Sequence, residues 1–514
     1  MKTALACLPL LALLLAAPAF SADKAPAAKT AAAAASATLA AREEKVATQH
    51  TMATNGETIR YTATAGTLVL RDEKGEPTAS LFYVAYTKDG VKDLSHRPVT
   101  FLYNGGPGSS SIWLHMGAFG PMRVVTTDAA PTPPPPYDLV PNQYSLLDKS
   151  DLVFIDAMST GFSKLLGKAE GKDFWGVDQD TKAFGQFIQR YLTVYDRWNS
   201  PKYLLGESYG TTRSANLADW LQHQGIALNG VILVSSVLNY GDTFPGTDLA
   251  YITYLPSYAA IAWYHDKLPN KPADLQAFLQ QVRQFARGEY ADALFQGSSL
   301  PAAEYNQVLA KLQQYTGLSE QYLKDANLRV DPTRFRAQLL RGDDRIMGRY
   351  DARFEGINPD DAAETPEYDP SDSSIGPAFT AAWNWYLQNE LQYHSDVPYA
   401  VTGYDVIRNW DWKHALPGRP SFFKPPLPDV AANLGEAMRQ NPHLKVFSAN
   451  GYFDLATPFF KTEFDIDQLM LPPDIYKNIG FHYYPSGHMI YLHVPALKHL
   501  KSDLSKFYAN TDNQ

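Results

Sequence analysis

The five residues Gly206-Glu207-Ser208-Tyr209-Gly210 constrain the fold of this chain more than any other stretch. They follow a short apolar run at 202–205 that is typical of a buried strand, and they precede 211–224, where apolar positions recur with a helical period. A Gly-x-Ser-x-Gly motif between a strand and a helix is the pattern of a nucleophile elbow, because small flanking residues permit the tight turn that exposes the serine. The positive end of the helix dipole beside Ser208 favours developing negative charge. Ser208 is therefore a candidate nucleophile. So short a pattern also arises by chance, so the assignment depends on whether the sequence also offers a catalytic base and an acid for this serine.

Apolar runs that alternate with helical segments indicate an α/β sheet. Runs without polar alternation are expected of strands that are buried on both faces. A helix is predicted over 181–195. Turn residues bound two earlier runs at 68–70 and 80–86, which we expect to form an antiparallel start to the sheet. The other predicted strands lie at 98–103, 152–156, 203–206, 230–235 and 444–448.

Residues 239–396 differ from the rest of the chain because they are polar, rich in helical patterns and poor in strand patterns. Amphipathic helices are predicted at 275–285, 302–315 and 319–326. The acidic, Pro-rich stretch 358–372 matches no calcium-loop spacing, so a solvated loop is favoured there. The predicted organisation is a signal peptide at 1–22, an Ala-rich linker at 23–45, an α/β core in two parts at 46–238 and 397–514, and a helical cap inserted at 239–396.

The beginning of the chain has the pattern of a secretory signal peptide. Lys2 precedes an apolar run at 4–17 and small residues at 19–22, and this run is too short to span a bilayer well. The single cysteine, Cys7, falls inside that segment, so the mature chain is expected to lack disulfides and thiolate metal sites. A net charge of -9 argues against a nucleic-acid-binding protein. We therefore expect an exported protein, periplasmic or extracellular, without stable membrane association after cleavage of the signal.

A glycine-rich loop follows the predicted strand at 98–103. Asn104-Gly105-Gly106-Pro107-Gly108-Ser109-Ser110 lets backbone N–H groups converge on one point, as an oxyanion hole requires. A phosphate-binding loop is the competing interpretation, but no Lys-Ser/Thr follows and the spacing is not that of a dinucleotide fingerprint. A purely structural turn remains open at this point.

Two further polar residues follow strand-like runs near the end of the chain. Asp454 comes shortly after the run at 444–448, and His488 lies on a Gly-flanked loop after 481–484. Taken singly, each is more often structural than catalytic. His482 and His493 are weaker candidates, because the first lies within the strand-like run and the second lies beyond the loop.

Order and position together point to a catalytic triad. Ser208, Asp454 and His488 occur in the order Ser, Asp, His, each just past the carboxyl end of a strand, which is the arrangement of the α/β-hydrolase fold. His488 would accept the Ser208 proton, Asp454 would hold the imidazole tautomer, and backbone donors would bind the oxyanion. No His-Glu-x-x-His motif occurs, so a zinc hydrolase is not indicated, and we predict neither a metal nor a cofactor.

With these motifs in place the chain resembles the serine carboxypeptidases, as a secreted bacterial member. The resemblance rests on the glycine loop, the elbow, Asp454 and Gly487-His488-Met489, with a further block at 156–163, and these motifs span about 98–495. It implies an α/β-hydrolase fold with a helical cap, a peptide substrate, and Ser208, Asp454 and His488 as the triad. By the same resemblance the oxyanion donors are the backbone N–H groups of Gly106 and Tyr209. The substrate carboxylate site is then formed by Asn104 and Glu207, and Glu207 must be neutral to donate a hydrogen bond, which favours acid pH.

Three positions depart from the family pattern. Ser109 stands where a Cys is usual, Leu102 where a Trp is usual, and Ala118 where the family has a second carboxylate-binding Glu. Arg213 would be a cationic substitute, or equally a packing or salt-bridge residue. Serine carboxypeptidase activity is thus the leading hypothesis. An esterase, an acyltransferase or a peptidase of other exo-specificity is the alternative, and a non-catalytic binding protein on a hydrolase scaffold is the third.

Overall fold

The apolar runs of the sequence form a mixed sheet of ten strands in the computed structural model, which describes residues 42–54, 56–243, 247–419, 422 and 424–511. The predicted signal peptide and most of the predicted linker lie outside the described residues. Along the sheet the order is β1 (Lys45–Thr54), β2 (Glu57–Arg71), β3 (Pro77–Lys88), β7 (Asp151–Ile155), β4 (Val99–Tyr103), β9 (Lys202–Ser208), β10 (Gly230–Ser236), β13 (Lys445–Gly451) and β14 (Ile479–Tyr484), and β8 (Lys164–Leu165) pairs with β3.

The two halves of this sheet differ in direction and in burial. Strands β1, β2, β3 and β7 pair antiparallel, whereas β7, β4, β9, β10, β13 and β14 are parallel. All residues of β4, β7 and β10 are buried, as predicted for strands covered on both faces. Strand β1 was not predicted, because its half-buried face includes Thr48, His50 and Thr54, so the sequence shows no alternation of apolar and polar residues.

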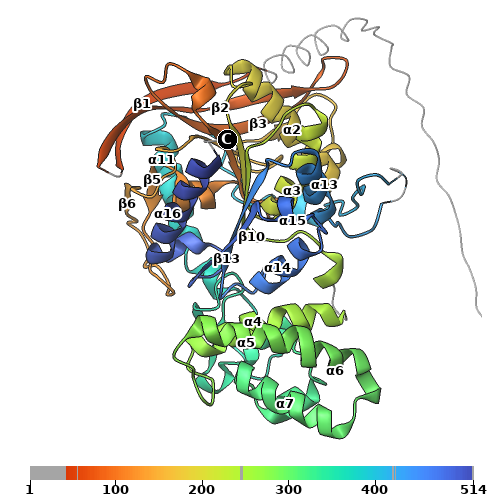
Figure 1. The fold of residues 1–514 in the computed structure, drawn as a ribbon. Coiled ribbons are helices and arrows are strands. Elements are labelled where there is room, and N and C mark those ends of the chain that lie inside the picture. The colour runs from red at the N-terminus through yellow and green to blue at the C-terminus, as the bar shows by residue number, and fades with distance from the viewer. Residues whose placement is uncertain (1–41, 55, 244–246, 420–421, 423, 512–514) are drawn as a thin grey trace, which may run out of the picture. The chain divides into compact units, whose positions relative to one another are not determined.

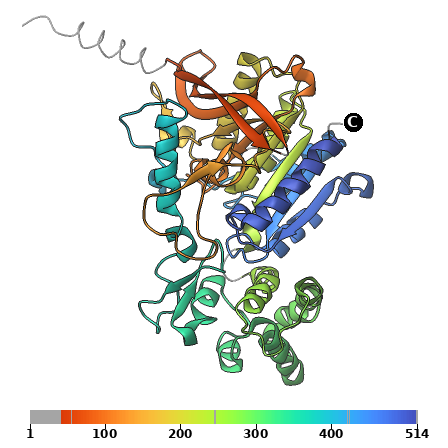
Figure 2. The same ribbon diagram turned by 90° about the vertical axis from the view of Figure 1, so that its left-hand side faces the viewer.

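Helices cover both faces of the sheet, as Figures 1 and 2 show. Apolar side chains of α2, α3 and α13 pack on one face, and those of α11 and α16 pack on the other. The helices are α2 (Val177–Val194), α3 (Tyr209–His223), α4 (Asp248–Tyr264), α5 (Leu275–Phe285), α6 (Ala291–Gln296), α7 (Ala302–Thr316), α8 (Glu320–Asp325), α9 (Pro332–Gln338), α10 (Pro370–Ser373), α11 (Gly376–Asn389), α12 (Tyr404–Arg408), α13 (Ala431–Gln440), α14 (Phe459–Asp467), α15 (Pro473–Tyr476) and α16 (Val494–Thr511). None of these described helices is both long enough and apolar enough to span a membrane.

A helical region with its own core lies between β10 and β13 in the sequence. Helices α4 to α9 share one hydrophobic cluster, which Phe453 and Phe459 join from the chain that follows β13. The predicted helices at 275–285 and 302–315 are present as α5 and α7. Helix α11 is also part of the predicted cap, but its side chains Phe379, Trp383 and Tyr386 pack in the core beside the sheet. The segment between β10 and β13 thus contributes to two cores, and Figure 1 shows α4 to α7 grouped at one end of the sheet.

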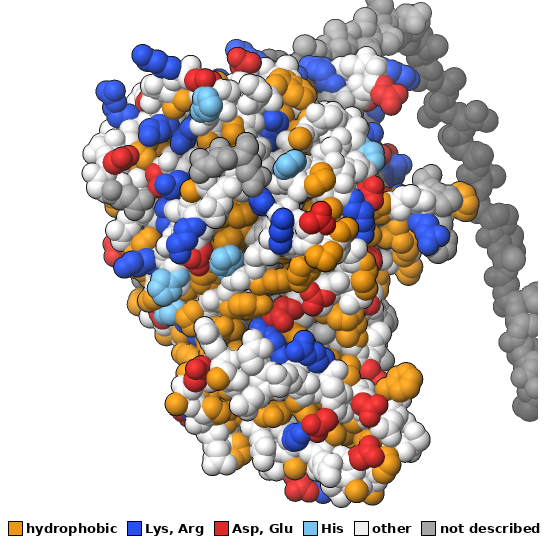
Figure 3. Space-filling model, in the orientation of Figure 1, with side chains coloured by type: hydrophobic (Ala, Val, Ile, Leu, Met, Phe, Trp, Pro, Cys, Tyr) orange, Lys and Arg blue, Asp and Glu red, His pale blue; other side chains and the backbone are white. Residues whose placement is uncertain are grey.

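Two small hairpins complete the described strands. Strand β5 (Met122–Val124) pairs with β6 (Leu139–Pro141), and β11 (Arg345–Met347) pairs with β12 (Glu355–Ile357). On the face drawn in Figure 3, acidic and basic side chains are interspersed with hydrophobic ones. This face carries no extended patch of one charge sign.

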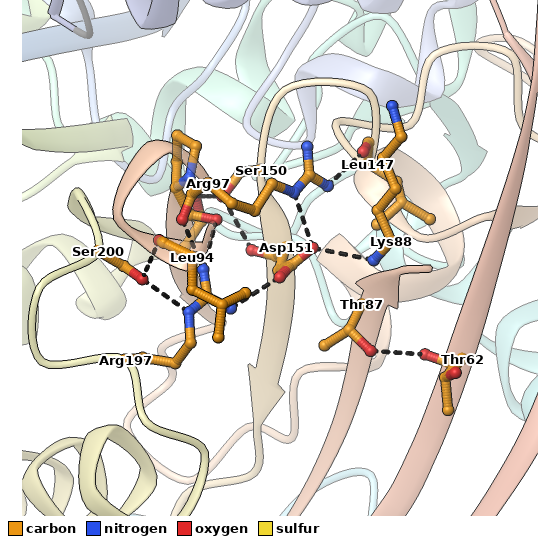
Figure 4. Close-up of polar contacts among 12 residues, drawn as sticks. Thr62, Thr87, Lys88, Leu94, Arg97, Leu147, Ser150, Asp151, Arg197 and Ser200 are labelled. Atoms are coloured by element: carbon orange, nitrogen blue, oxygen red, sulfur yellow. Dashed lines mark hydrogen bonds and ion pairs between the residues drawn. The ribbon is translucent and has the colours of Figure 1, made fainter. Parts of the chain in front are cut away.

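A buried ion-pair cluster joins the amino ends of the central strands (Figure 4). Asp151, the first residue of β7, accepts hydrogen bonds from Arg97 Nε at 2.9 Å and from Arg197 Nη1 at 2.7 Å. Its Oδ1 also accepts from the backbone N–H of Lys88 at 3.0 Å. All three charged side chains are nearly inaccessible to solvent. Because ligands in open α/β sheets bind at the carboxyl ends of the strands, we assign this cluster to stability rather than to catalysis.

Candidate active site

The turn between β9 and α3 places Ser208 at the carboxyl end of the sheet. Ser208 has φ 61° and ψ -130°, a conformation that costs energy for a residue with a side chain. A Cβ atom on Gly206 would collide with the carbonyl of Gly210, so the turn requires glycine there. The strand, turn and helix that the motif predicts are present, and the strained serine is the expected feature of a nucleophile elbow.

The glycine loop after β4 packs directly on this elbow. A Cβ on Gly105 would collide with the backbone nitrogens of Tyr209 and Gly210. Gly106 and Tyr209 both line the cavity above Ser208. Tyr209 is the first residue of α3, so its N–H has no partner within the helix. The two predicted oxyanion donors therefore come from neighbouring segments and lie at one cavity.

Neighbouring strands bring Asp454 and His488 together. Asp454 follows β13 and His488 follows β14, and these two strands are paired in parallel. His488 Nδ1 lies 2.7 Å from Asp454 Oδ2, and both side chains are buried. Burial lowers the pKa of His488, but Asp454 and Glu207 raise it, and the net direction is above its ordinary 6.5. The carboxylate thus fixes the imidazole tautomer in which Nε2 is free to accept a proton.

Thr457 completes the support of the aspartate. Asp454 Oδ1 accepts from the N–H groups of Ala456 and Thr457 at 2.7 and 2.9 Å, and the Thr457 hydroxyl donates to Oδ2 at 2.6 Å. The same hydroxyl lies 3.1 Å from His488 Nδ1. These donors hold the Asp454 carboxylate in one orientation toward the imidazole.

The three predicted triad residues meet at one cavity of about 410 Å³. Ser208 and His488 line it, while Asp454 lies behind the imidazole. His488 Nε2 is buried and has no hydrogen-bond partner among the described residues. The structure does not bring His482 or His493 to this cavity. These two lie 3.7 Å from Asp503 and 3.8 Å from Asp128, respectively.

Glu207 and Asn104 lie side by side because β4 and β9 are paired with Tyr103 opposite Gly206. Asn104 Nδ2 donates to Glu207 Oε1 at 2.7 Å, and the Tyr491 hydroxyl donates to the same oxygen at 3.2 Å. The other oxygen, Oε2, is buried without a hydrogen-bond partner among the described residues. Burial raises the pKa of Glu207 from 4.5 to about 7, although the nearby His488 opposes that rise. Glu207 is therefore a carboxyl group that is readily kept neutral at the floor of the cavity.

Of the three departures from the family pattern, Ser109 lines the cavity and the other two lie away from it. Leu102 and Ala118 are fully buried in the core, and neither lines the cavity. Arg213 does not reach the cavity either, because its Nε donates to Asp180 at 2.7 Å and its guanidinium lies 4.1 Å from the centre of the Phe184 ring. Arg213 is thus a packing and salt-bridge residue. With Ala118 in the core, Glu207 is the one acidic side chain of the carboxylate site.

Several residues at the site were not found from the sequence. Tyr491 and Thr457 each lie three positions after a triad residue, and only this spacing from His488 and Asp454 would have indicated them. Arg349 and Tyr350 enter the cavity from the segment between β11 and β12, where no local pattern marks them. Among the described residues, no group of three or more His, Cys, Asp or Glu side chains is placed to hold a metal ion.

Fold and site together define the class of this protein. A mixed sheet with helices on both faces, a strained serine after a central strand and an Asp-His pair after the last two strands characterise the α/β hydrolases. Residues 58–284 match the family described as serine carboxypeptidase. Over this segment, which contains the glycine loop and the elbow, the chain is similar to that family.

One relative illustrates the similarity, first in sequence and then in structure. The pheromone-processing carboxypeptidase KEX1 of Saccharomyces cerevisiae is 34% identical over 156 residues, which cover 28% of this chain and 20% of KEX1. The matched region thus spans about a fifth of that relative's length. The crystal structure of Kex1(delta)p, a prohormone-processing carboxypeptidase from Saccharomyces cerevisiae, superposes with a TM-score of 0.53 at 18% identity and covers 88% of this chain and 91% of that one. This second similarity supports the fold.

Proposed function

We propose that this protein is a serine carboxypeptidase, which hydrolyses the C-terminal peptide bond of its substrate through an acyl-enzyme. The observation that carries the proposal is the free oxygen of Glu207, buried beside the triad in the same cavity. Asn104 and Tyr491 both donate to Oε1, so the proton of a neutral Glu207 resides on Oε2. That O–H can donate to a terminal carboxylate, which an ionised Glu207 would repel.

The triad performs the bond cleavage. His488 Nε2 accepts the proton of the Ser208 hydroxyl as its oxygen attacks the carbonyl carbon of the last peptide bond. The resulting oxyanion accepts hydrogen bonds from the N–H groups of Gly106 and Tyr209. His488 then gives its proton to the leaving amine, which departs as the C-terminal amino acid. Water repeats the attack on the acyl-Ser208 ester, with His488 as base, and restores the serine.

The carboxylate site restricts this chemistry to chain ends. A peptide whose terminal carboxylate lies on Asn104 and Glu207 has its last peptide bond beside Ser208, because Glu207 directly precedes the serine. A blocked or amidated end offers no carboxylate there. Discrimination between a free acid and an amide is therefore the property that separates a carboxypeptidase from other hydrolases on this fold.

The test compares an N-terminally blocked dipeptide, which has a free C-terminal carboxylate, with the same dipeptide amidated at its C-terminus. We expect the free acid to be cleaved at least tenfold faster in kcat/KM, since the amide replaces the charge-assisted hydrogen bond from Glu207 with a neutral one. Ser208→Ala is expected to lower kcat by about 10⁶-fold, and a fluorophosphonate is expected to label the wild type at Ser208. Hydrolysis by Ser208→Ala at the wild-type rate would refute the serine mechanism.

One observation favours a second candidate function. With Ala118 buried in the core, the site lacks the second acid that the family uses, so an esterase, an acyltransferase or a peptidase of other exo-specificity is the alternative. Equal rates on the free acid and the amide would establish it. That result would leave the triad chemistry intact and would remove only the carboxylate recognition.

We further propose that the protein is exported from a bacterial cell, to the periplasm or the medium. The apolar run at 4–17 after Lys2 supports this proposal, as does the absence of cysteine from the rest of the chain. Mass spectrometry of the protein recovered from cell fractions tests it. We expect an N-terminus near residue 22 in the exported fraction, and an intact Met1 in the cytoplasm would contradict the proposal.

A further inference from the structure

Arg349 is the single Lys or Arg among the described residues that line the catalytic cavity. Its side chain is exposed, and no carboxylate of the described residues lies within 4.0 Å of its guanidinium. The guanidinium lies 5.4 Å from the centre of the Tyr350 ring, which itself faces the His488 imidazole at 5.2 Å. A cation that forms no ion pair among the described residues thus faces the cavity, which it shares with the Asp372 carboxylate.

The backbone holds Arg349 firmly in this place. Its N–H donates to Asp369 Oδ1 at 3.0 Å, and its carbonyl accepts from the N–H of Leu455 at 3.1 Å. The carbonyl of the next residue, Tyr350, accepts from the N–H of His488 at 2.6 Å. The segment is therefore bonded to the loops of both Asp454 and His488, which fixes the origin of the arginine side chain relative to the reacting atoms.

Arg349 and the carboxylate site come from different segments of the cavity lining. Arg349 lies beside the Tyr350 ring, on the segment that is bonded to the Asp454 and His488 loops. Glu207 is instead enclosed by Asn104 and Tyr491. A neutral acid already provides for the terminal carboxylate, so the arginine is available for a second anionic group of the same substrate.

We propose that Arg349 binds the side-chain carboxylate of an aspartate or glutamate in the peptide, at one of the two residues that flank the scissile bond. This inference rests on the proposed function. A guanidinium presents a planar fork of donors that matches a carboxylate, and its charge persists at every pH at which the triad works. Asp372, the other charged side chain at the cavity besides Glu207 and the triad, is acidic and does not offer this interaction.

The experiment uses four peptides that differ only in having Glu or Gln at the last or the penultimate position. We expect the wild type to prefer Glu over Gln at one of the two positions by about tenfold in kcat/KM, as for a charge-assisted hydrogen bond in a partly exposed site. Arg349→Gln should abolish that preference, so that the variant cleaves the Glu and Gln peptides with equal kcat/KM. Arg349→Lys restores part of it, and added salt weakens it.

Arg345→Gln is the matched control. Arg345 lies four residues earlier in β11, bears the same charge, donates to the neighbouring Asp344 carbonyl and does not line the cavity. We expect it to keep the wild-type preference. A second measurement avoids turnover. It compares the Kd values of the Glu and Gln peptides for Ser208→Ala with those for the double variant that also carries Arg349→Gln.

Three results would overturn the inference. The first is a wild type that cleaves the peptides without preferring Glu at either position. The second is an Arg349→Gln variant that loses activity equally on all four peptides, which would assign Arg349 to the terminal carboxylate or to the site's architecture. The third is a wild type that cleaves none of them and binds Glu and Gln peptides equally. In that case the proposed function fails as well, whereas the first two results leave it standing.

Discussion

Replacing Glu207 with Gln tests whether this carboxyl group works in its neutral form. Gln keeps the shape of a protonated Glu, its Oε1 can accept from Asn104 and Tyr491, and its Nε2 can donate where Oε2 lies. The variant therefore mimics a Glu207 that never ionises. Because the side chain is 2% exposed, solvent does little to screen the difference.

The magnitude follows from the pKa of Glu207, which is about 7 in the folded protein against an ordinary value of 4.5. In the unfolded chain the group ionises near 4.5, so between these two pH values the unfolded state holds fewer protons than the folded state. Folding stability contributed by Glu207 is then greatest below pH 4.5 and falls as the pH rises toward 7. At about 1.4 kcal/mol per pH unit, the loss is about 3 kcal/mol.

We therefore expect Glu207→Gln to match the wild type in stability at pH 4.5 and to exceed it by up to about 3 kcal/mol at pH 8. Urea denaturation at both pH values measures the difference. The same variant should retain its preference for free acids over amides above pH 7, where the wild type loses about a factor of ten per pH unit. Equal stability curves and equal pH profiles for the two proteins would refute the reasoning.

Three further substitutions test other parts of the structure. Asp454→Asn should lower kcat by about 10⁴-fold with little change in KM, because His488 loses the partner that fixes its tautomer. Gly105→Ala should lower kcat by about 100-fold or more, since its methyl group would push the oxyanion loop off the elbow, and a fluorophosphonate labelling rate measures this directly. Asp151→Asn should cost about 3 kcal/mol in urea denaturation by leaving two buried guanidinium groups unpaired, with kcat/KM unchanged. A loss of activity without a loss of stability in Asp151→Asn would contradict its assignment.

The sequence predicted the parallel half of the sheet because burial on both faces leaves long apolar runs. Strand β9 and helix α3 could be placed from the elbow motif alone, and the amphipathic helix at 275–285 has the predicted bounds. Strand β1 could not be recognised, because a strand with one polar face and several threonines does not differ enough from an extended linker.

The site was predictable where chemistry requires a residue type at a fixed place after a strand. That condition holds for Ser208, Asp454 and His488, which the strand order then brings to one edge of the sheet. It does not hold for Arg349, whose position depends on how the segment between β11 and β12 crosses above the sheet. The pKa of Glu207 could not be predicted from the sequence either, because the burial that raises it is produced by residues that are far apart in the chain.

The single acid at the carboxylate site has a consequence for the range of pH in which the protein works. Where two carboxyl groups share a site, each opposes ionisation of the other and a shared proton is retained to higher pH. Here Ala118 is buried in the core, so burial, with a smaller contribution from the charge of Asp454, must keep Glu207 protonated, and the nearby His488 works against it. His488 must itself be neutral to act as the base, and its own pKa lies above 6.5. Glu207 loses its proton as the pH rises through about 7, and His488 gains one as the pH falls, so cleavage of free-acid peptides should decline at both high and low pH.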